Sequence, residues 1–316
     1  MPKKDQDADK EFQNVLAQLH QGVLDLDLVA SHGTLKEVNV LLLLKALKYN
    51  NKIKSLLIED NQLSGYLLKN ILYYLVSSPY LETLDCSGNP IEKISLKIIL
   101  EIISKNNRLN YLRLNNCFLT PEMVEALALV LTSNRTIKTL DLSSNQVGEK
   151  GLLALENMLK KNKTIKKLNL SCCFLGNKEI KSFVNSLKTN TTLKALDLSW
   201  NRMTMPYLWE LSEAVLSSYI DDLNLEYNDL KDDKNTTTKL VMMNIRVQNT
   251  SKFSIETLSS LPSPLLRQYQ QSMSPRKRKS DSDLDIPLIL EENSDEKKGF
   301  LSDDTMLKKK EECVIS

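Results

Sequence analysis

The sequence predicts an α/β solenoid, a horseshoe with parallel strands on its concave face and helices on its convex face. Similar segments recur along the 316-residue chain, and they begin at Ile53, Leu81, Leu109, Ile137, Ile165, Leu193 and Ile220. Five of the intervals between these starts are 28 residues long and one is 27. A fixed period of this length is typical of stacked repeats, because each unit buries its apolar face only against its neighbours.

Each repeat is expected to contain one strand and one helix. In the fourth repeat, Leu140 and Leu142 alternate with polar residues, which is the period-two pattern of a half-buried strand. Leu152, Leu155 and Leu159 follow at the spacing of one helical face. The 58 leucines of the chain, against 8 glycines, supply the apolar side of both elements.

The ninth position of the repeats holds Asn61, Asn89, Cys117, Asn145, Cys173, Asn201 and Asn228. We expect these side chains to bond the backbone of the inner turn, where unpaired polar groups are costly. With the pattern L-x-x-L-x-L-x-x-N/C-x-L, this column resembles the ribonuclease-inhibitor-like class of leucine-rich repeats. The resemblance covers about residues 23–232. It implies the fold but no single function, because the class includes inhibitors, GTPase activators, immune sensors and cytoskeletal adaptors.

Four parts are expected along the chain. Residues 1–22 form a charged segment and a capping helix, and residues 23–232 hold about eight repeats of 27–30 residues. Residues 233–272 form a C-terminal cap, because the end of a solenoid core must be shielded. Residues 273–316 are a charged tail whose composition favours disorder.

Composition argues against several function classes. The 42 basic and 40 acidic residues nearly cancel, so no overall field favours nucleic acid. Two histidines and few glycines leave no basis for a histidine metal centre, a catalytic triad or a phosphate-binding loop. We therefore expect neither an enzyme nor a bound cofactor or metal. The N-terminus lacks the apolar core of a signal peptide, and no apolar run has the length of a membrane span.

The strand residues that flank the leucines point into the horseshoe, and two aromatic residues stand out among them. Trp200 and Tyr227 occupy equivalent positions of adjacent repeats, so their rings are expected to be neighbours. Large aromatic residues are typical anchors of protein interfaces. We therefore predict a partner-binding groove centred on this pair, with Asp197 and Glu226 beside it. The alternative is that both rings pack under the C-terminal cap.

A second, weaker candidate for partner binding lies further toward the N-terminus, on the same face. It consists of Tyr111 and Arg113.

The last four residues, Cys313 to Ser316, match the C-a-a-X prenylation box, and a final serine favours farnesyl. Lys308–Lys310 would supply the second signal that a single lipid chain needs, although Glu311 and Glu312 reduce that charge. We expect a prenyltransferase to modify Cys313 and the chain to associate partially and reversibly with a membrane.

The tail also holds four consecutive basic residues, Arg276, Lys277, Arg278 and Lys279. They resemble a nuclear import signal, and they could equally add to the charge that attracts a membrane.

The leading hypothesis is a monomeric, non-enzymatic scaffold that binds a protein on the concave face, without nucleic acid, at the cytosolic side of a membrane. The nucleus is a further possible location. One alternative is a bacterial effector of the type IV kind that uses host prenylation inside a host cell. Another is a small-GTPase regulator, by resemblance of the repeats to Ran GTPase activators.

Overall fold

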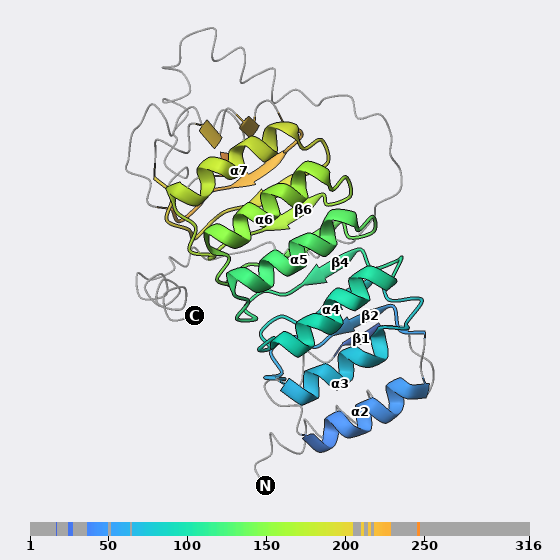
Figure 1. The fold of residues 1–316 in the computed structure, drawn as a ribbon. Helices are drawn as coiled ribbons and strands as arrows, with labels where there is room; N and C mark the ends of the chain where they lie inside the picture. The colour runs from blue at the N-terminus through green and yellow to red at the C-terminus, as the bar shows by residue number, and fades with distance from the viewer. Residues whose placement is uncertain are drawn as a thin grey trace, which may run out of the picture. The chain divides into compact units, whose positions relative to one another are not determined.

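The computed structural model describes residues 17, 25–27, 37–49, 52–63, 65–204, 210–211, 214–215, 218–228 and 245–246 (Figure 1). The chain divides into two units, and all of these residues belong to the unit that spans residues 1–248. Most of the expected capping segments and the whole tail lie outside the described residues.

Within the described ranges, nine short strands form one parallel sheet in which the order of the strands follows the order of the chain. They are β1 (Asp25–Asp27), β2 (Ser55–Leu57), β3 (Thr83–Asp85), β4 (Tyr111–Arg113), β5 (Thr139–Asp141), β6 (Lys167–Asn169), β7 (Ala195–Asp197), β8 (Asp222–Asn224) and β9 (Ile245–Arg246). Equivalent residues of successive repeats pair with each other, as Leu84 does with Leu112. The predicted parallel arrangement is confirmed.

Helices cover one face of this sheet (Figure 1). They are α2 (Glu37–Tyr49), α3 (Gly65–Leu75), α4 (Lys93–Lys105), α5 (Pro121–Ser133), α6 (Gly148–Lys161) and α7 (Asn177–Thr189). The predicted stripe of α6 is buried, with Leu155 and Leu159 fully enclosed. Within the described residues, no helix combines the length and apolar character that crossing a bilayer requires.

Leucines from strands and helices meet in one continuous core between the two layers. Leu84, Leu112 and Leu140, the central residues of three successive strands, have no exposed surface. Gly151 of α6 lies against Val124 of α5, and a Cβ atom at Gly151 would come within 3.1 Å of that side chain. The missing side chain therefore lets these two helices approach each other closely.

The asparagines at position nine connect each repeat to the one before it. The Asn145 amide nitrogen donates to the carbonyl oxygens of Leu114, Leu142 and Ser143 at 2.8–3.0 Å. Its Oδ1 accepts the backbone N–H groups of Cys117 and Leu119, at 3.1 and 2.9 Å. The expected bonding of the inner turn is confirmed, and it crosses between repeats.

A cysteine at the same position fills this role less completely, because sulfur is a weaker donor and acceptor than an amide. The Cys117 thiol donates to the carbonyl oxygen of Cys86 at 3.3 Å. The backbone N–H groups of Gly88 and Asn89 interact with the sulfur and lower its pKa, against the larger effect of burial. The preceding turn is built differently, because the Ile91 N–H donates to the backbone carbonyl of Cys117 instead. Pro90 lies in that turn, where Phe118 and Phe174 of other repeats have φ values of 55° and 59°. Proline cannot adopt such angles, so its place before a cysteine repeat fits the altered turn.

A second asparagine column follows the helices, at Asn106, Asn134, Asn162 and Asn190. Asn190 shows its role: the amide nitrogen donates to the carbonyl oxygen of Leu159 at 2.8 Å. Its Oδ1 accepts the N–H groups of Thr192 and Leu193. Each residue of this column is buried and joins the end of one helix to the next repeat. From residue types alone, these segments are recognisable only as polar turns.

Candidate protein-binding face

The side of the sheet that lies opposite the helices is here called the sheet face. It carries rows of side chains from equivalent positions of the repeats. Position five gives Leu57, Asp85, Arg113, Asp141, Asn169, Asp197 and Asn224. Position seven gives Glu59, Ser87, Asn115, Ser143, Ser171, Ser199 and Glu226. Five carboxylates and one guanidinium make these two rows acidic.

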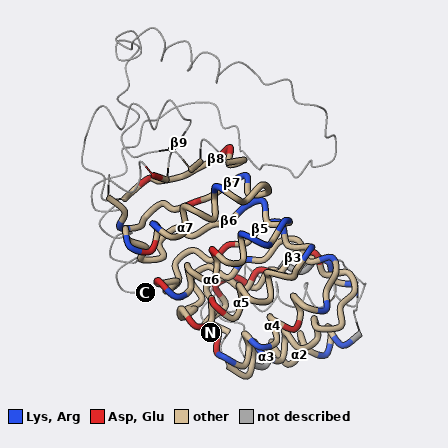
Figure 2. The backbone as a smooth tube through the Cα atoms, turned by 45° about the horizontal axis from the view of Figure 1, so that its top comes forward, with Lys and Arg blue, Asp and Glu red and all other residues tan. Residues whose placement is uncertain are grey.

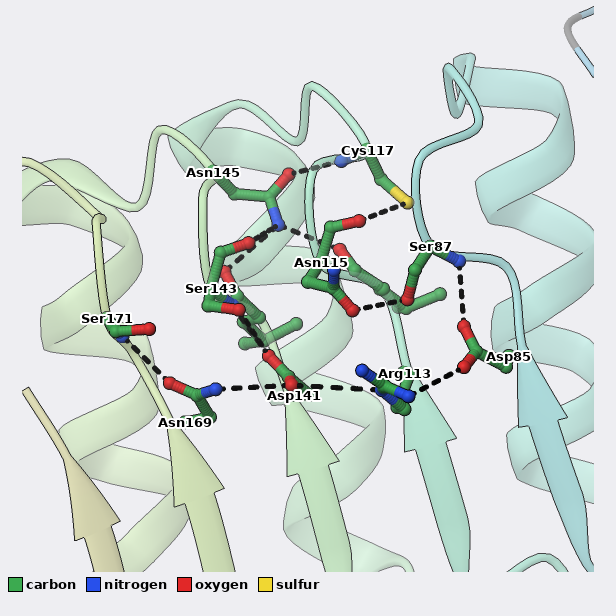
Figure 3. A network of polar contacts seen from close by, with 12 residues as sticks. Asp85, Ser87, Arg113, Asn115, Cys117, Asp141, Ser143, Asn145, Asn169 and Ser171 are labelled. Carbon is green, nitrogen blue, oxygen red and sulfur yellow. Dashed lines mark hydrogen bonds and ion pairs between the residues drawn. The ribbon is translucent and has the colours of Figure 1, made fainter. Parts of the chain in front are cut away.

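Side chains of position five bond one another along the sheet (Figure 3). The Arg113 guanidinium lies 3.1 Å from an Asp85 oxygen and 3.9 Å from an Asp141 oxygen. The Asn169 amide donates to the same Asp141 oxygen at 3.2 Å. Asn224 repeats this contact with Asp197 at 3.0 Å.

The carboxylates of this row also fix the backbone of their own repeat. Asp141 accepts the Ser143 N–H at 3.0 Å and the Ser143 hydroxyl at 2.7 Å. Asp197 accepts the corresponding groups of Ser199 at 2.9 and 2.6 Å. Of the residues predicted to bind a partner, Arg113 and Asp197 are therefore already held by neighbouring side chains. Their main visible role is to order the surface.

Negative charge is concentrated around Arg113, where water is partly excluded. Burial raises the pKa of Glu59, and Asp85 adds to this effect while Arg113 opposes it. Burial also raises the pKa of the Tyr111 hydroxyl, which is half-buried beside the same groups. Burial opposes the charge of Arg113, but the nearby carboxylates, Asp85 first, outweigh it and raise its pKa. The arrangement favours a cation from a partner over an anion.

Trp200 and Tyr227 stack at the end of the strands β7 and β8. Their ring centroids are 4.0 Å apart and their planes differ by 18°. Both side chains are partly exposed. The prediction that the two rings are neighbours is confirmed. The C-terminal cap, which the alternative places over both rings, falls largely outside the described residues.

Both aromatic residues have a left-handed backbone, with φ values of 55° for Trp200 and 58° for Tyr227. The whole of position eight shares this conformation: Asp60, Gly88, Asn116, Ser144, Cys172, Trp200 and Tyr227. In the first six of these residues it lets the N–H bond the next repeat, as Trp200 does with the Glu226 carbonyl at 2.9 Å. Glycine, asparagine and aspartate tolerate this region, whereas a large aromatic side chain is uncommon there. The alternation of apolar and polar residues gives no sign of this strain, although the column contains those tolerant residue types.

The buried thiols offer no reactive group. Burial raises the pKa of Cys117 and of Cys173 to about 12, and that of Cys86 well above its usual range. Within the part of the chain that the structure describes, no three histidine, cysteine or acidic side chains are grouped as metal ligands are. The remaining predicted residues, Cys313 and the basic group Arg276, Lys277, Arg278 and Lys279, lie outside the described residues.

Comparison with known proteins identifies the repeats. A family model described as Leucine Rich repeat matches residues 133–155 and 189–204. Mouse NACHT, LRR and PYD domains-containing protein 9C is 32% identical over 119 residues, which are 37% of this chain and 12% of that protein. Pig ribonuclease inhibitor is 37% identical over 78 residues, which are 24% of this chain and 17% of that protein.

Among solved structures, the actin-binding site 2 (ABS2) of leiomodin-1 aligns with a TM-score of 0.39 at 21% identity, over 49% of this chain and 90% of that one. The stretches shared with the two sequence relatives span less than a fifth of either relative. The repeats of this chain are leucine-rich repeats, similar to those of ribonuclease inhibitor and of NACHT, LRR and PYD domains-containing proteins, and they fold as a leucine-rich-repeat solenoid.

Proposed function

We propose that the chain is a non-enzymatic scaffold whose protein partner contacts the sheet face around Trp200 and Tyr227. The stacked pair carries this proposal. Ser144 occupies the same position in another repeat and keeps the same backbone conformation, so the fold does not require an aromatic residue there. Two large rings held in a strained conformation at the surface are better explained by an interface.

The chemistry of the surroundings defines the partner. Tyr227 follows Glu226, and Asp197 lies on the strand that leads to Trp200. Further along the sheet, Asp85 and Asp141 exceed the charge of Arg113. A partner that places an apolar side chain against the ring pair and basic side chains along the carboxylates would match this surface. The name of ribonuclease inhibitor describes a protein that acts on another protein, which supports a binding role for similar repeats.

The test compares two pairs of aromatic substitutions in the full chain. W200A with Y227A removes the stacked pair, whereas Y66A with Y73A removes two exposed tyrosines from helix α3. A partner captured by the unmodified chain is purified, and its affinity for each variant is measured by calorimetry. We expect about a hundredfold loss with the first pair, as for interface hot spots, and little change with the second. Equal binding by both variants would show that the partner uses another surface.

We further propose that prenylation of Cys313 tethers the scaffold to the cytosolic side of a membrane. The match of residues 313–316 to the C-a-a-X pattern supports this. Metabolic labelling with a farnesyl analogue in eukaryotic cells tests it, with C313S as the control. We expect label on the unmodified chain and none on the variant. An unlabelled wild-type chain would exclude the tether.

A further inference from the structure

Positive charge gathers at one edge of the sheet from the end of the third repeat to the sixth. This edge, where helices end and strands β5, β6 and β7 begin, is here called the basic edge. It consists of Arg135, Lys138, Lys160, Lys161, Lys163, Lys166, Lys167, Lys188 and Lys194, and all nine side chains are exposed. Figure 2 shows Lys and Arg segments beside these strands.

Few carboxylates balance the basic edge. Lys160 pairs with Glu156 at 2.6 Å and Lys194 with Asp221 at 3.7 Å. Among the described residues, the other seven cations have no carboxylate oxygen within 4.0 Å. Arg135 is satisfied differently, by the backbone carbonyls of Thr132 and Asn134.

The opposite edge, where the helices begin, is built differently. Lys150 lies 2.9 Å from Glu125 and 3.9 Å from Glu122. Lys178 lies 2.6 Å from Glu149. Both of these lysines pair with acids of the adjacent helix. The small net charge of the chain, +2, therefore hides a difference between the two edges.

Helix stabilisation explains only part of the basic edge. Lys160, Lys161 and Lys188 lie in the last turns of α6 and α7, where cations favour the helix dipole. Lys138, Lys166 and their neighbours lie on the segments that lead into strands, where no helix end needs them. Successive repeats are in register, so these lysines stand side by side at the spacing of sheet strands.

The composition of the basic edge favours a diffuse anionic surface. Eight of its nine cations are lysines, which act as point charges, whereas bidentate recognition of a single phosphate favours arginine. The exposed Tyr219 lies beside Lys194, with the ammonium 5.2 Å from the ring centre. Tyrosine suits the headgroup level of a bilayer because its ring is apolar and its hydroxyl polar.

We propose that the basic edge is a docking surface for an anionic phospholipid bilayer. It lies at the strand starts, while Trp200 and Tyr227 lie beyond the strand ends, so a bilayer would leave the aromatic pair accessible. Lysines near an anionic bilayer act together, so several of them bind measurably and bind less in salt. The proposal does not depend on a lipid at Cys313.

The test uses the full, unprenylated chain and vesicles of phosphatidylcholine, either pure or with about 30% phosphatidylserine. The edge variant is K138A/K166A/K167A. The control, K93A/K97A/K181A, removes the same charge from exposed lysines of helices α4 and α7. Both variants keep the tail, so its basic residues contribute equally. Thermal unfolding by circular dichroism verifies that both are folded.

We expect the unmodified chain to sediment with phosphatidylserine vesicles but not with pure phosphatidylcholine. The edge variant should bind at least about tenfold more weakly than the control variant. Equal binding by the two variants would overturn the proposal. So would a titration with duplex RNA in which the edge substitutions abolish RNA binding but leave vesicle binding intact. No sample in this experiment is prenylated. A negative result therefore does not bear on the proposed Cys313 tether, which the farnesyl labelling experiment tests separately.

Discussion

Replacing Asn145 by alanine tests whether the position-nine column holds the repeats together. The substitution removes an amide that donates to three carbonyl oxygens and accepts two backbone N–H groups. Both N–H groups, of Cys117 and Leu119, belong to the preceding repeat and are buried. The alanine variant therefore breaks contacts on both sides of one repeat boundary.

The expected loss follows from the groups left without partners. Each buried N–H without an acceptor costs about 1–3 kcal/mol, so the two together cost about 2–6 kcal/mol. The carbonyl oxygens lose less, because the carbonyl groups of a turn reach water or other donors more easily. A loss of this size is a large share of the about 5–15 kcal/mol that stabilises a typical domain.

Urea unfolding followed by circular dichroism measures the change, with Q146A as the control. Gln146 is the exposed neighbour, and its replacement should change stability by less than about 0.5 kcal/mol. Amide hydrogen exchange at Cys117 and Leu119 should accelerate in N145A, which locates the damage. N145C separates the two roles of the amide, because a thiol donates but scarcely accepts. If N145C were as stable as the unmodified chain, the acceptor role of Asn145 would be refuted.

Three further outcomes follow from the site. Burial and Asp85 raise the pKa of Glu59, so folding takes up a proton above pH 4.5 and stability falls as the pH rises through that window. E59Q should therefore raise the melting temperature at pH 7 and lose this advantage below about pH 4; an equal shift at both values would contradict the assignment. Because three thiols are buried, they should react with iodoacetamide at pH 8 at least about a hundredfold more slowly in the folded chain than in urea. These are Cys86, Cys117 and Cys173. Peptide mass spectrometry measures the two rates. W200G should be about 1 kcal/mol more stable than W200A in urea unfolding, because glycine adopts the left-handed backbone without strain; equal stabilities would argue against that conformation.

The repeat period made the fold predictable. Seven segments in phase place one strand each, and parallel register then brings equivalent positions together, which is why the Trp200–Tyr227 contact could be anticipated. The position-nine asparagines were predictable for the same reason. The helix-end column that includes Asn134 and Asn190 carries the same spacing, but polar residues in a turn are common and their bonding partners lie in the preceding repeat.

The sheet face was harder to predict, because its chemistry depends on which side chains face each other across strands. Arg113 stays a predicted partner-binding residue, but the sequence did not show that register sets it between Asp85 and Asp141. The left-handed backbone of position eight could not be predicted from the residue types, because Ser144 and Trp200 occur there as well as Gly88. The basic edge was hidden by an overall charge near zero, because summing over the chain removes all information on where charges lie.

The alternation of asparagine and cysteine determines how this solenoid could be shortened or lengthened. A cysteine repeat depends on an asparagine in the repeat that follows, as Cys117 depends on Asn145 and Cys173 on Asn201. Deleting the repeat of Asn145 alone would place Cys117 before Cys173, and two buried N–H groups would lose their acceptor. Deleting or duplicating a cysteine repeat together with the asparagine repeat after it would leave every junction intact. The modular unit of the central repeats is thus a pair of repeats, although the sequence period is the length of a single repeat.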